Sequence, residues 1–182
     1  AVEVVLATAL VPNYFKAEEE GSVWARRSTH LGSALVGLRY EQLLPGALPH
    51  ENADQAFRVI PGDFVTTEDG TGMVHTAPTF GADDARVAAA AGVPPLLVLN
   101  EDGDPVPLVD LRGRFLPQAG GSWAGKFVKN AYYPAEEAPK LSVDEEIAIQ
   151  LKTENKAFKV QKYVHSYPHC WRTDKPVLYY PL

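Results

Sequence analysis

The amino-acid sequence predicts an α+β fold, built as a strongly bent mixed β-sheet or partial barrel with a few short helices. Three observations lead to this class. Short apolar runs that favour strands recur along the 182 residues, and only two segments carry a helical pattern. Gly and Pro, 14 and 15 residues respectively, separate these runs at short intervals. Many short strands with few helices between them are typical of α+β domains.

The composition is that of a folded chain with an acidic balance. Apolar residues make up 46% of the sequence and aromatic residues 10%, which suffices for the core of one domain. The formal charge of −6 argues against a surface devoted to binding polyanions. No apolar run approaches the roughly 18 residues of a membrane span, and the first residues lack the layout of a signal peptide. We therefore expect a soluble, cytoplasmic protein with no membrane partner.

The single cysteine, Cys170, excludes an internal disulfide and fits a reducing compartment. Its neighbours His165 and His169 raise the question of a metal site. Structural zinc sites need paired ligands such as C-x-x-C, and the residue three positions after Cys170 is Thr173. We expect no metal here.

Extended runs alternate with turns in the N-terminal part of the chain. Its valines favour a strand within residues 1–10, and a turn or short helix follows in 11–20. Further strands are predicted at 35–40, 57–60 and 63–66, the last two joined by Pro61 and Gly62.

Two helices are predicted, and both have recognisable ends. The alanine-rich run from residue 82 to 91 is ended by Gly92. The run from 142 to 156 begins with a capping box, in which Ser142 is followed three residues later by Glu145. Its apolar stripe, at helical spacing, consists of Val143, Ile147 and Leu151.

The remaining strands lie after the first helix and near the C-terminus. A short buried strand is predicted at 96–99, followed by the hairpin-like turn N-E-D-G-D at 100–104. Alternating residues predict strands at 158–164 and 177–180.

The stretch from Thr66 to Asp84 gathers the residues best suited to chemistry. It reads T-T-E-D-G-T-G-M-V-H-T-A-P-T-F-G-A-D-D. A polar turn with Gly70 and Gly72 precedes a short apolar strand, residues 73–74, and His75 follows the strand. Sites are often built on such loops, although a half-buried histidine with only a structural role is an equally simple interpretation.

An acidic pair closes this stretch and opens the first helix. Asp83 is predicted as the N-cap, and Asp84 follows it inside the first turn. Carboxylates are stabilised there by the free N–H groups and the dipole of the helix. A structural role at the helix start is the alternative to a role in binding.

Three segments carry a resemblance to a known family. The pattern G-T-G-M-V-H-T-A-P-x-x-G-x-D-D resembles the signature of the editing domain inserted into isoleucyl-tRNA synthetase, shared more loosely with the valyl and leucyl enzymes. K-Y-V-H-S-Y-P-H-C-W-R (162–172) resembles the segment where the insertion returns to the catalytic domain, and G-L-R-Y-E-Q-L-L (37–44) resembles a segment ahead of the editing core. The three segments follow one another in the family's order and together span most of the chain.

The resemblance implies hydrolysis of the ester in misacylated valyl-tRNA(Ile), by direct attack of water. It implies no cofactor and no metal for editing, while ATP belongs to the catalytic domain of the whole enzyme. The implied partners are the 3′ end of tRNA(Ile) with its misattached valine and the catalytic domain of the same synthetase. Residues 1–165 would form the editing domain, and 166–182 the return segment.

The motif also implies roles for individual residues. Asp84 matches the family's aspartate that holds the α-ammonium of the misattached amino acid, and His75 matches the histidine of the pocket wall that helps to exclude isoleucine. Several other positions have either a substrate contact or a purely structural role: Thr76, Thr79, Asp83, Gly70 and Gly72. Trp123 would either stack on the terminal nucleotide or be buried. Lysines 152, 156, 159 and 162 form either a solvated face or tRNA contacts.

The sequence departs from the family pattern in one way that bears on activity. The family's threonine-rich segment, of the form T-T-T-P-W-T, has no match, and neither have the synthetase signatures H-I-G-H and K-M-S-K-S. We therefore expect a piece of a larger enzyme or a shortened relative of it. The alternatives are a catalytically incomplete fragment that keeps the fold and tRNA binding, a valyl-tRNA synthetase editing domain that clears threonine, and an unrelated small-molecule binding module.

Overall fold

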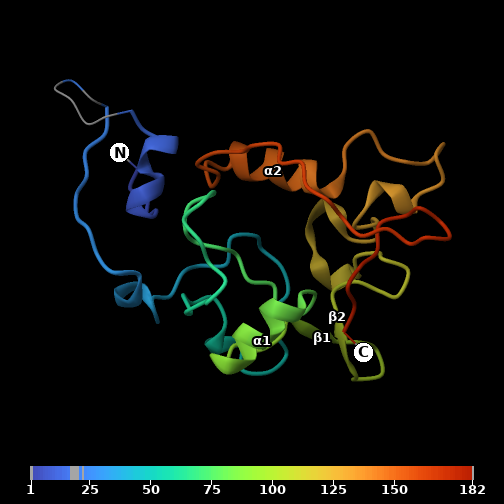
Figure 1. Ribbon diagram of the computed structural model, residues 1–182. Helices are drawn as coiled ribbons and strands as arrows, with labels where there is room; N and C mark the ends of the chain where they lie inside the picture. Colours follow the sequence, from blue (N-terminus) through green and yellow to red (C-terminus); the bar gives the residue numbers. More distant parts are fainter. Residues whose placement is uncertain (1, 17–20, 22, 182) are drawn as a thin grey trace.

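The computed structural model describes residues 2–16, 21 and 23–181. Within these ranges it has two α-helices, α1 (Ala82–Ala90) and α2 (Val143–Thr153), and one antiparallel strand pair, β1 (Leu97–Leu99) and β2 (Pro105–Pro107). Short 3₁₀ helices occupy η1 (Thr8–Asn13), η2 (Gly32–Leu35), η3 (Ala53–Gln55), η4 (Pro117–Ala119), η5 (Gly121–Trp123) and η6 (Asn130–Tyr132). Figure 1 shows α2 above α1 and the hairpin, with the N-terminal segment to one side. The predicted α+β class is confirmed in this coarse sense.

The hairpin confirms the strand predicted at 96–99 and the turn after it. Strands β1 and β2 pair with Val98 opposite Val106. The side-chain oxygen of Asn100 accepts the backbone N–H groups of Asp102 and Asp104, at 3.0 and 2.8 Å. The turn is thus held by its first residue, as Asx turns are.

Helix α2 begins with the predicted capping box and rests on the core. The Ser142 hydroxyl accepts the Glu145 N–H at 3.3 Å, and the Ser142 N–H donates to the Glu145 carboxylate at 2.8 Å. Val143 is buried against Trp123 and Ala119. The half-buried side chains packed around these three are Leu44, Leu108, Phe115 and Ile147. This cluster fixes α2 to residues 108–123 and to Leu44.

Helix α1 also lies close to the predicted range, and Gly92 follows its C-cap, Ala91. Gly92 has φ +69°, the left-handed conformation that terminates helices and that glycine adopts without a steric penalty. Val87 and Ala88 point into the protein and are buried. The helix is therefore anchored by one small apolar face.

The bent sheet or partial barrel that we predicted is not formed within the described residues. Segments 35–40 and 57–60 do meet, through three backbone hydrogen bonds of 2.8–3.0 Å between residues 37–40 and 57–59. They make only the isolated bridge between Arg39 and Arg58. Phe57 has φ +53°, and this left-handed residue interrupts the extended backbone that a longer ladder requires.

The other predicted strands are also wrong. Residues 2–7, 63–66, 73–74, 158–164 and 177–180 contain no strand, and η1 begins at Thr8. Residue 1 and the end of the predicted turn or helix at 11–20 lie outside the described residues. Alternating apolar residues favour extended backbone, but a strand also needs a partner for its N–H and C=O groups.

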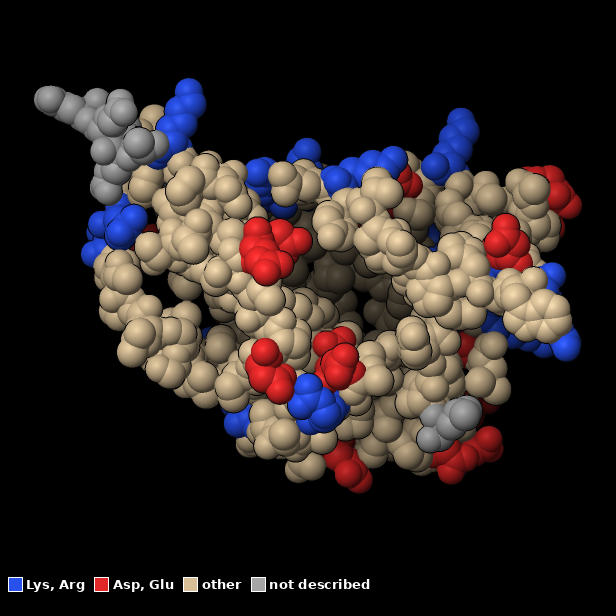
Figure 2. Space-filling view, in the orientation of Figure 1, with Lys and Arg blue, Asp and Glu red and all other residues tan. Residues whose placement is uncertain are grey.

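The chain exposes an unusually large surface. Its accessible area is 13322 Å² for 19.9 kDa, whereas a compact monomer of this mass exposes about 8,700 Å². Figure 2 shows the molecule hollowed between α2 and α1. No helix in the described part of the chain is both long and apolar enough to cross a membrane.

Candidate functional site

The site predicted between residues 66 and 84 is a run of turns that leads into α1. Gly70 and Gly72 have φ +64° and +76°, values that favour glycine. The Thr71 carbonyl accepts the Ala7 N–H at 2.8 Å, and the Gly70 carbonyl accepts the Tyr14 hydroxyl at 3.0 Å. The N-terminal segment thus packs against the glycine turn.

Gly72 permits this packing because it lacks a side chain. A Cβ at position 72 would lie 2.6 Å from the Cβ of Ala7, closer than two carbon atoms approach without a bond. The group that comes close to Gly72 in this structure is therefore the side chain of Ala7. The contact of Gly70 and Gly72 with adenosine stays a prediction.

Asp84 is placed by the glycine three residues before it. A Cβ on Gly81 would lie 2.5 Å from the Asp84 Oδ2 atom. The half-buried carboxylate occupies this space and accepts the Ala77 N–H at 3.3 Å. The G-x-D-D motif thus holds the carboxylate over the start of α1, where the helix dipole favours negative charge.

The prediction that Asp83 caps α1 is wrong. The N-cap is Gly81, which has no side-chain hydrogen bond to offer, and Asp83 is the second residue of the helix. Its exposed carboxylate lies 3.8 Å from Arg86, which also pairs with Asp63 at 3.3 Å. Over α1, Figure 2 shows acidic and basic side chains side by side.

His75 and Thr76 lie on the irregular segment between the glycine turn and α1. His75 is exposed and Thr76 is half-buried. The His75 imidazole makes no hydrogen bond or ion pair with any residue in the described part of the chain. The structure thus leaves His75 accessible on the loop that precedes α1, while Asp84 lies in the first turn of that helix, without a contact between the two.

Thr79 has a structural role in this loop. It is 8% exposed, and its hydroxyl accepts the Leu96 N–H at 2.9 Å and faces the Leu96 carbonyl at 3.4 Å. The neighbouring ring of Phe80 meets Tyr180 edge-on, with centroids 6.2 Å apart. Burial raises the pKa of Tyr180, and the nearby charge of Asp110 raises it further. These contacts fix the loop to the hairpin and the C-terminal tail.

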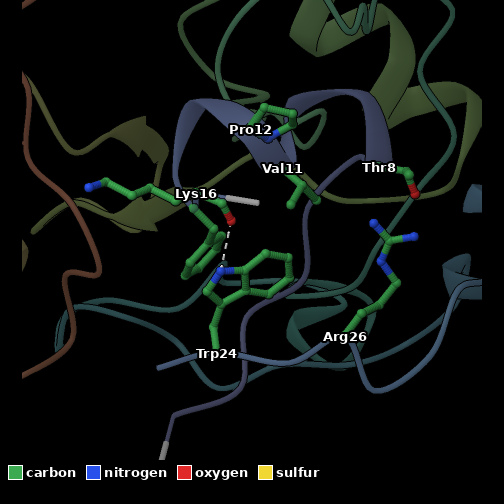
Figure 3. Close-up of a pocket in the computed structure, with 7 residues that line it drawn as sticks. Thr8, Val11, Pro12, Lys16, Trp24 and Arg26 are labelled. Atoms are coloured by element: carbon green, nitrogen blue, oxygen red, sulfur yellow. Dashed lines mark hydrogen bonds between the residues drawn. The ribbon is translucent and has the colours of Figure 1, made fainter. Parts of the chain in front are cut away.

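Two cavities lie near this loop, and sequence reasoning missed both. The smaller, of about 250 Å³, is formed by the N-terminal segment. Figure 3 shows the Trp24 indole donating to the Lys16 carbonyl, at 3.0 Å, at the edge of this cavity. Its lining residues are Thr8, Val11, Pro12, Phe15, Lys16, Trp24 and Arg26. No local pattern signals it, because its walls come from two separate segments, residues 8–16 and 24–26.

The larger cavity, of about 620 Å³, lies between α1 and residues 58–63. Its polar lining is Arg58, Asp63 and Arg86, and the rest is mainly apolar. Arg58 donates to the Ala91 carbonyl at the end of α1, where a cation is favourable. His75 and Asp84 line neither of these two cavities.

The Cys170 region is a tight turn. Hydrogen bonds from the Thr173 side chain and from the backbone of Arg172 and Thr173 hold the pKa of the Cys170 thiol below its ordinary value. In the described ranges, no three His, Cys, Asp or Glu residues come together as a metal site would need. Trp123 is buried in the core, at 4% exposure.

Comparison with known proteins gives the family. No family model matches the chain. Isoleucine–tRNA ligase of Cytophaga hutchinsonii is 51% identical over 203 residues, an alignment that takes in 100% of the chain and 18% of that protein. The chain belongs to the isoleucine–tRNA ligase family.

Other isoleucine–tRNA ligases agree. That of Bacteroides fragilis is 47% identical over 100% of the chain and 18% of its own length. That of Porphyromonas gingivalis is 51% identical over 83% of the chain and 14% of its own length. The chain therefore spans less than a fifth of these relatives, and it corresponds to a segment of a synthetase, an enzyme class.

Proposed function

We propose that this chain is the editing domain of an isoleucyl-tRNA synthetase and hydrolyses the ester of misacylated valyl-tRNA(Ile). The observation that carries the proposal is the Asp84 carboxylate, held over the start of α1 by the absence of a side chain at Gly81. The family membership and the shared motif support it. We also propose that the α+β chain has the editing-domain type of fold and works in the cytoplasm.

The chemistry requires an anion for the substrate's α-ammonium, a wall for the side chain and donors for the developing oxyanion. Asp84 supplies the anion. His75, exposed on the loop before α1, supplies part of the wall and orients the attacking water. Thr76 and Asp83 lie close enough along the chain to contact the substrate. Water attacks directly, because no activated Ser or Cys nucleophile is placed by a recognised motif.

Selectivity for valine over isoleucine depends on size. Isoleucine carries one methylene more, which is worth about 1–3 kcal/mol in a binding pocket. A second, smaller pocket that admits only valine multiplies the discrimination made by the first. No metal or cofactor is assigned to this step, and ATP is used by the catalytic domain of the whole enzyme. Residues 166–182 would lead back to that domain.

A second candidate function is favoured by one observation. His75 and Asp84 line neither of the two cavities described above. A chain that keeps the fold and tRNA contacts but lacks hydrolysis would have this arrangement. The names of the relatives do not favour the valyl enzyme.

Deacylation of valyl-tRNA(Ile) and isoleucyl-tRNA(Ile) by the 182-residue chain, measured against buffer, separates these candidates. We expect selective loss of valine, slowed about 10- to 100-fold in Asp84→Asn, because a hydrogen bond to a charged group is worth about 1.5–3 kcal/mol. Asp102→Asn, at an exposed position in the turn between β1 and β2, is the matched control and should deacylate like the original chain. Equal rates in the chain and in buffer, from folded protein, would contradict hydrolysis and favour the second candidate.

A further inference from the structure

The larger cavity, between α1 and residues 58–63, has two walls that the fold itself holds in place. We call it the α1 cavity; its volume of about 620 Å³ lies within the range of small-molecule sites. One wall is the helix. The other is tied to a neighbouring segment by two backbone hydrogen bonds, from the Gly37 N–H to the Val59 carbonyl at 2.9 Å and from the Val59 N–H to the Leu38 carbonyl at 2.8 Å. A ligand would therefore find the walls already formed.

The lining of the α1 cavity is mainly aliphatic. Val36 is 47% exposed, and Ala90 is exposed on the face of α1. Covering such apolar surface removes it from water, which favours an aliphatic ligand. The apolar side chains that line the cavity are Val36, Val59, Ile60, Pro61, Val87 and Ala90.

The charged lining has one positive charge in excess. The Arg86 guanidinium pairs with the Asp63 carboxylate at 3.3 Å, so these two charges offset one another. Asp83 approaches Arg86 at 3.8 Å from outside the lining, and 85% of its side chain is exposed. Arg58 donates to the Ala91 carbonyl, which carries only the partial charge of a helix end. The α1 cavity thus favours a ligand with a single negative charge.

Arg58 also has hydrogen-bonding capacity that the fold does not use. A guanidinium has five N–H donors, and the Arg58 Nε atom is buried without a hydrogen-bond partner among the described residues. A buried donor without an acceptor is unfavourable, and a carboxylate is the acceptor that a guanidinium binds best, through two parallel hydrogen bonds. Because Nε is covered in this structure, the guanidinium must rotate to bring it to a ligand.

We propose that the α1 cavity binds a small aliphatic monocarboxylate, with the carboxylate on Arg58 and the hydrocarbon chain against the aliphatic lining. A zwitterionic amino acid fits less well, since the carboxylate of the lining, Asp63, is already paired with Arg86. The site is separate from the residues of the proposed function, because neither His75 nor Asp84 lines it. Each proposal can therefore fail alone.

Titration of the 182-residue chain with sodium hexanoate tests the site, with the amide NMR signals of residues 87–91 as the readout. We expect saturable shifts with a dissociation constant on the order of 1–10 mM, as befits a ligand of so few atoms. Hexan-1-ol and hexylammonium have the same chain without the negative charge. They should bind at least about tenfold more weakly, because a hydrogen bond to a charged group is worth about that factor or more.

Two leucine substitutions on α1 separate the cavity from the rest of the helix. Ala90→Leu fills the cavity from an exposed position and should weaken hexanoate binding at least about tenfold, and Leu forms helices nearly as well as Ala. Ala89→Leu, at the exposed neighbouring position outside the lining, is the matched control and should bind like the original chain. Arg58→Gln should reduce the affinity for hexanoate to that for hexan-1-ol.

Three results would overturn the proposal: no saturable shifts, equal affinity for hexanoate and hexylammonium, or equal binding by Ala89→Leu and Ala90→Leu. Asp84→Asn should bind hexanoate like the original chain. Intact deacylation of valyl-tRNA(Ile) by a chain that does not bind hexanoate would overturn this inference alone, and the reverse would overturn the proposed function alone.

Discussion

The two helices of this chain begin in opposite ways. At α2, the Ser142 and Glu145 side chains and backbone N–H groups bond to one another, and Glu146 in the same turn pairs with Lys126 at 2.6 Å. At α1, the N-cap is Gly81 and no side chain caps the helix. Its first-turn carboxylates point instead to solvent, at Asp83, and back to the preceding loop, at Asp84.

The difference teaches which helix start stabilises the fold and which remains available to a ligand. A capping box uses the free N–H groups and a carboxylate within the protein. A helix start without a side-chain cap keeps N–H groups and negative charge in reach of an incoming group. In this chain, the uncapped start is the one that carries the G-x-D-D sequence. Substitutions at the start of each helix therefore test whether the α2 start stabilises the fold and the α1 start serves ligand binding. Four substitutions are given below, from the largest expected effect to the smallest.

Trp123→Ala should have the largest effect, because it removes the buried ring on which the start of α2 rests. Loss of a buried Trp costs about 3–5 kcal/mol in the free energy of unfolding. Urea denaturation measures it. Trp171→Ala is the control, since that ring is 85% exposed, and it should change stability by no more than about 0.5 kcal/mol. Equal effects would contradict the core described here.

Gly81→Ala should break the α1 start. The new Cβ would occupy the place of the Asp84 carboxylate and displace it from the Ala77 N–H. Loss of this hydrogen bond to a charged group costs about 1.5–3 kcal/mol. Faster hydrogen exchange at the Ala77 amide reports the displacement directly, and deacylation should fall as in Asp84→Asn. Unchanged exchange at this amide would show that the carboxylate does not depend on the glycine.

Ser142→Ala should destabilise the chain by about 1 kcal/mol, the usual effect of losing an N-cap. The hydrogen bonds from Ser142 lower the pKa of Glu145. A carboxyl group whose pKa is lower in the folded than in the unfolded chain stabilises the fold at any pH above its unfolded-state pKa. This stabilisation is lost as the pH falls through the pKa of the folded state. The difference between Ser142→Ala and the original chain should therefore shrink below the ordinary pKa range of Glu, as urea denaturation at several pH values would show. A constant difference would contradict the capping box.

Asp83→Asn should have the smallest effect. Its carboxylate is exposed and only weakly paired with Arg86, so it contributes the helix-dipole term alone, about 0.3–1 kcal/mol at low salt. Thermal unfolding should show that added salt removes most of the stability difference between Asp83→Asn and the original chain. A loss as large as that of Ser142→Ala would mean that Asp83 acts as a cap after all.

Features encoded within a few residues were predictable from the sequence. The capping box, the Asn100 turn and the end of α1 at Gly92 each depend on neighbours in the chain. The strands were not, because pairing depends on distant partners and on single residues such as Phe57 with its left-handed backbone. For the same reason, the sequence motif indicated the site residues but not their three-dimensional arrangement.

The candidate site shows this limit most clearly. The motif pointed to His75 and Asp84, but not to the hydrogen bond that ties Asp84 to Ala77. The cap was assigned to Asp83, since carboxylates are common caps, although the backbone turns into the helix two residues earlier, at Gly81. The contact of Tyr14 with Phe158, 6.2 Å between ring centroids, joins residues too far apart in sequence for any local pattern to indicate it.

The space beside Gly81 also constrains how this segment can change during descent. The Asp84 carboxylate can keep its present place only where position 81 has no Cβ. A lineage that acquires a side chain at position 81 therefore removes the support of the aspartate, and selection to keep the aspartate ceases to act through this contact. Glycine at 81 and aspartate at 84 should consequently be inherited together and lost together, as one unit of variation rather than two.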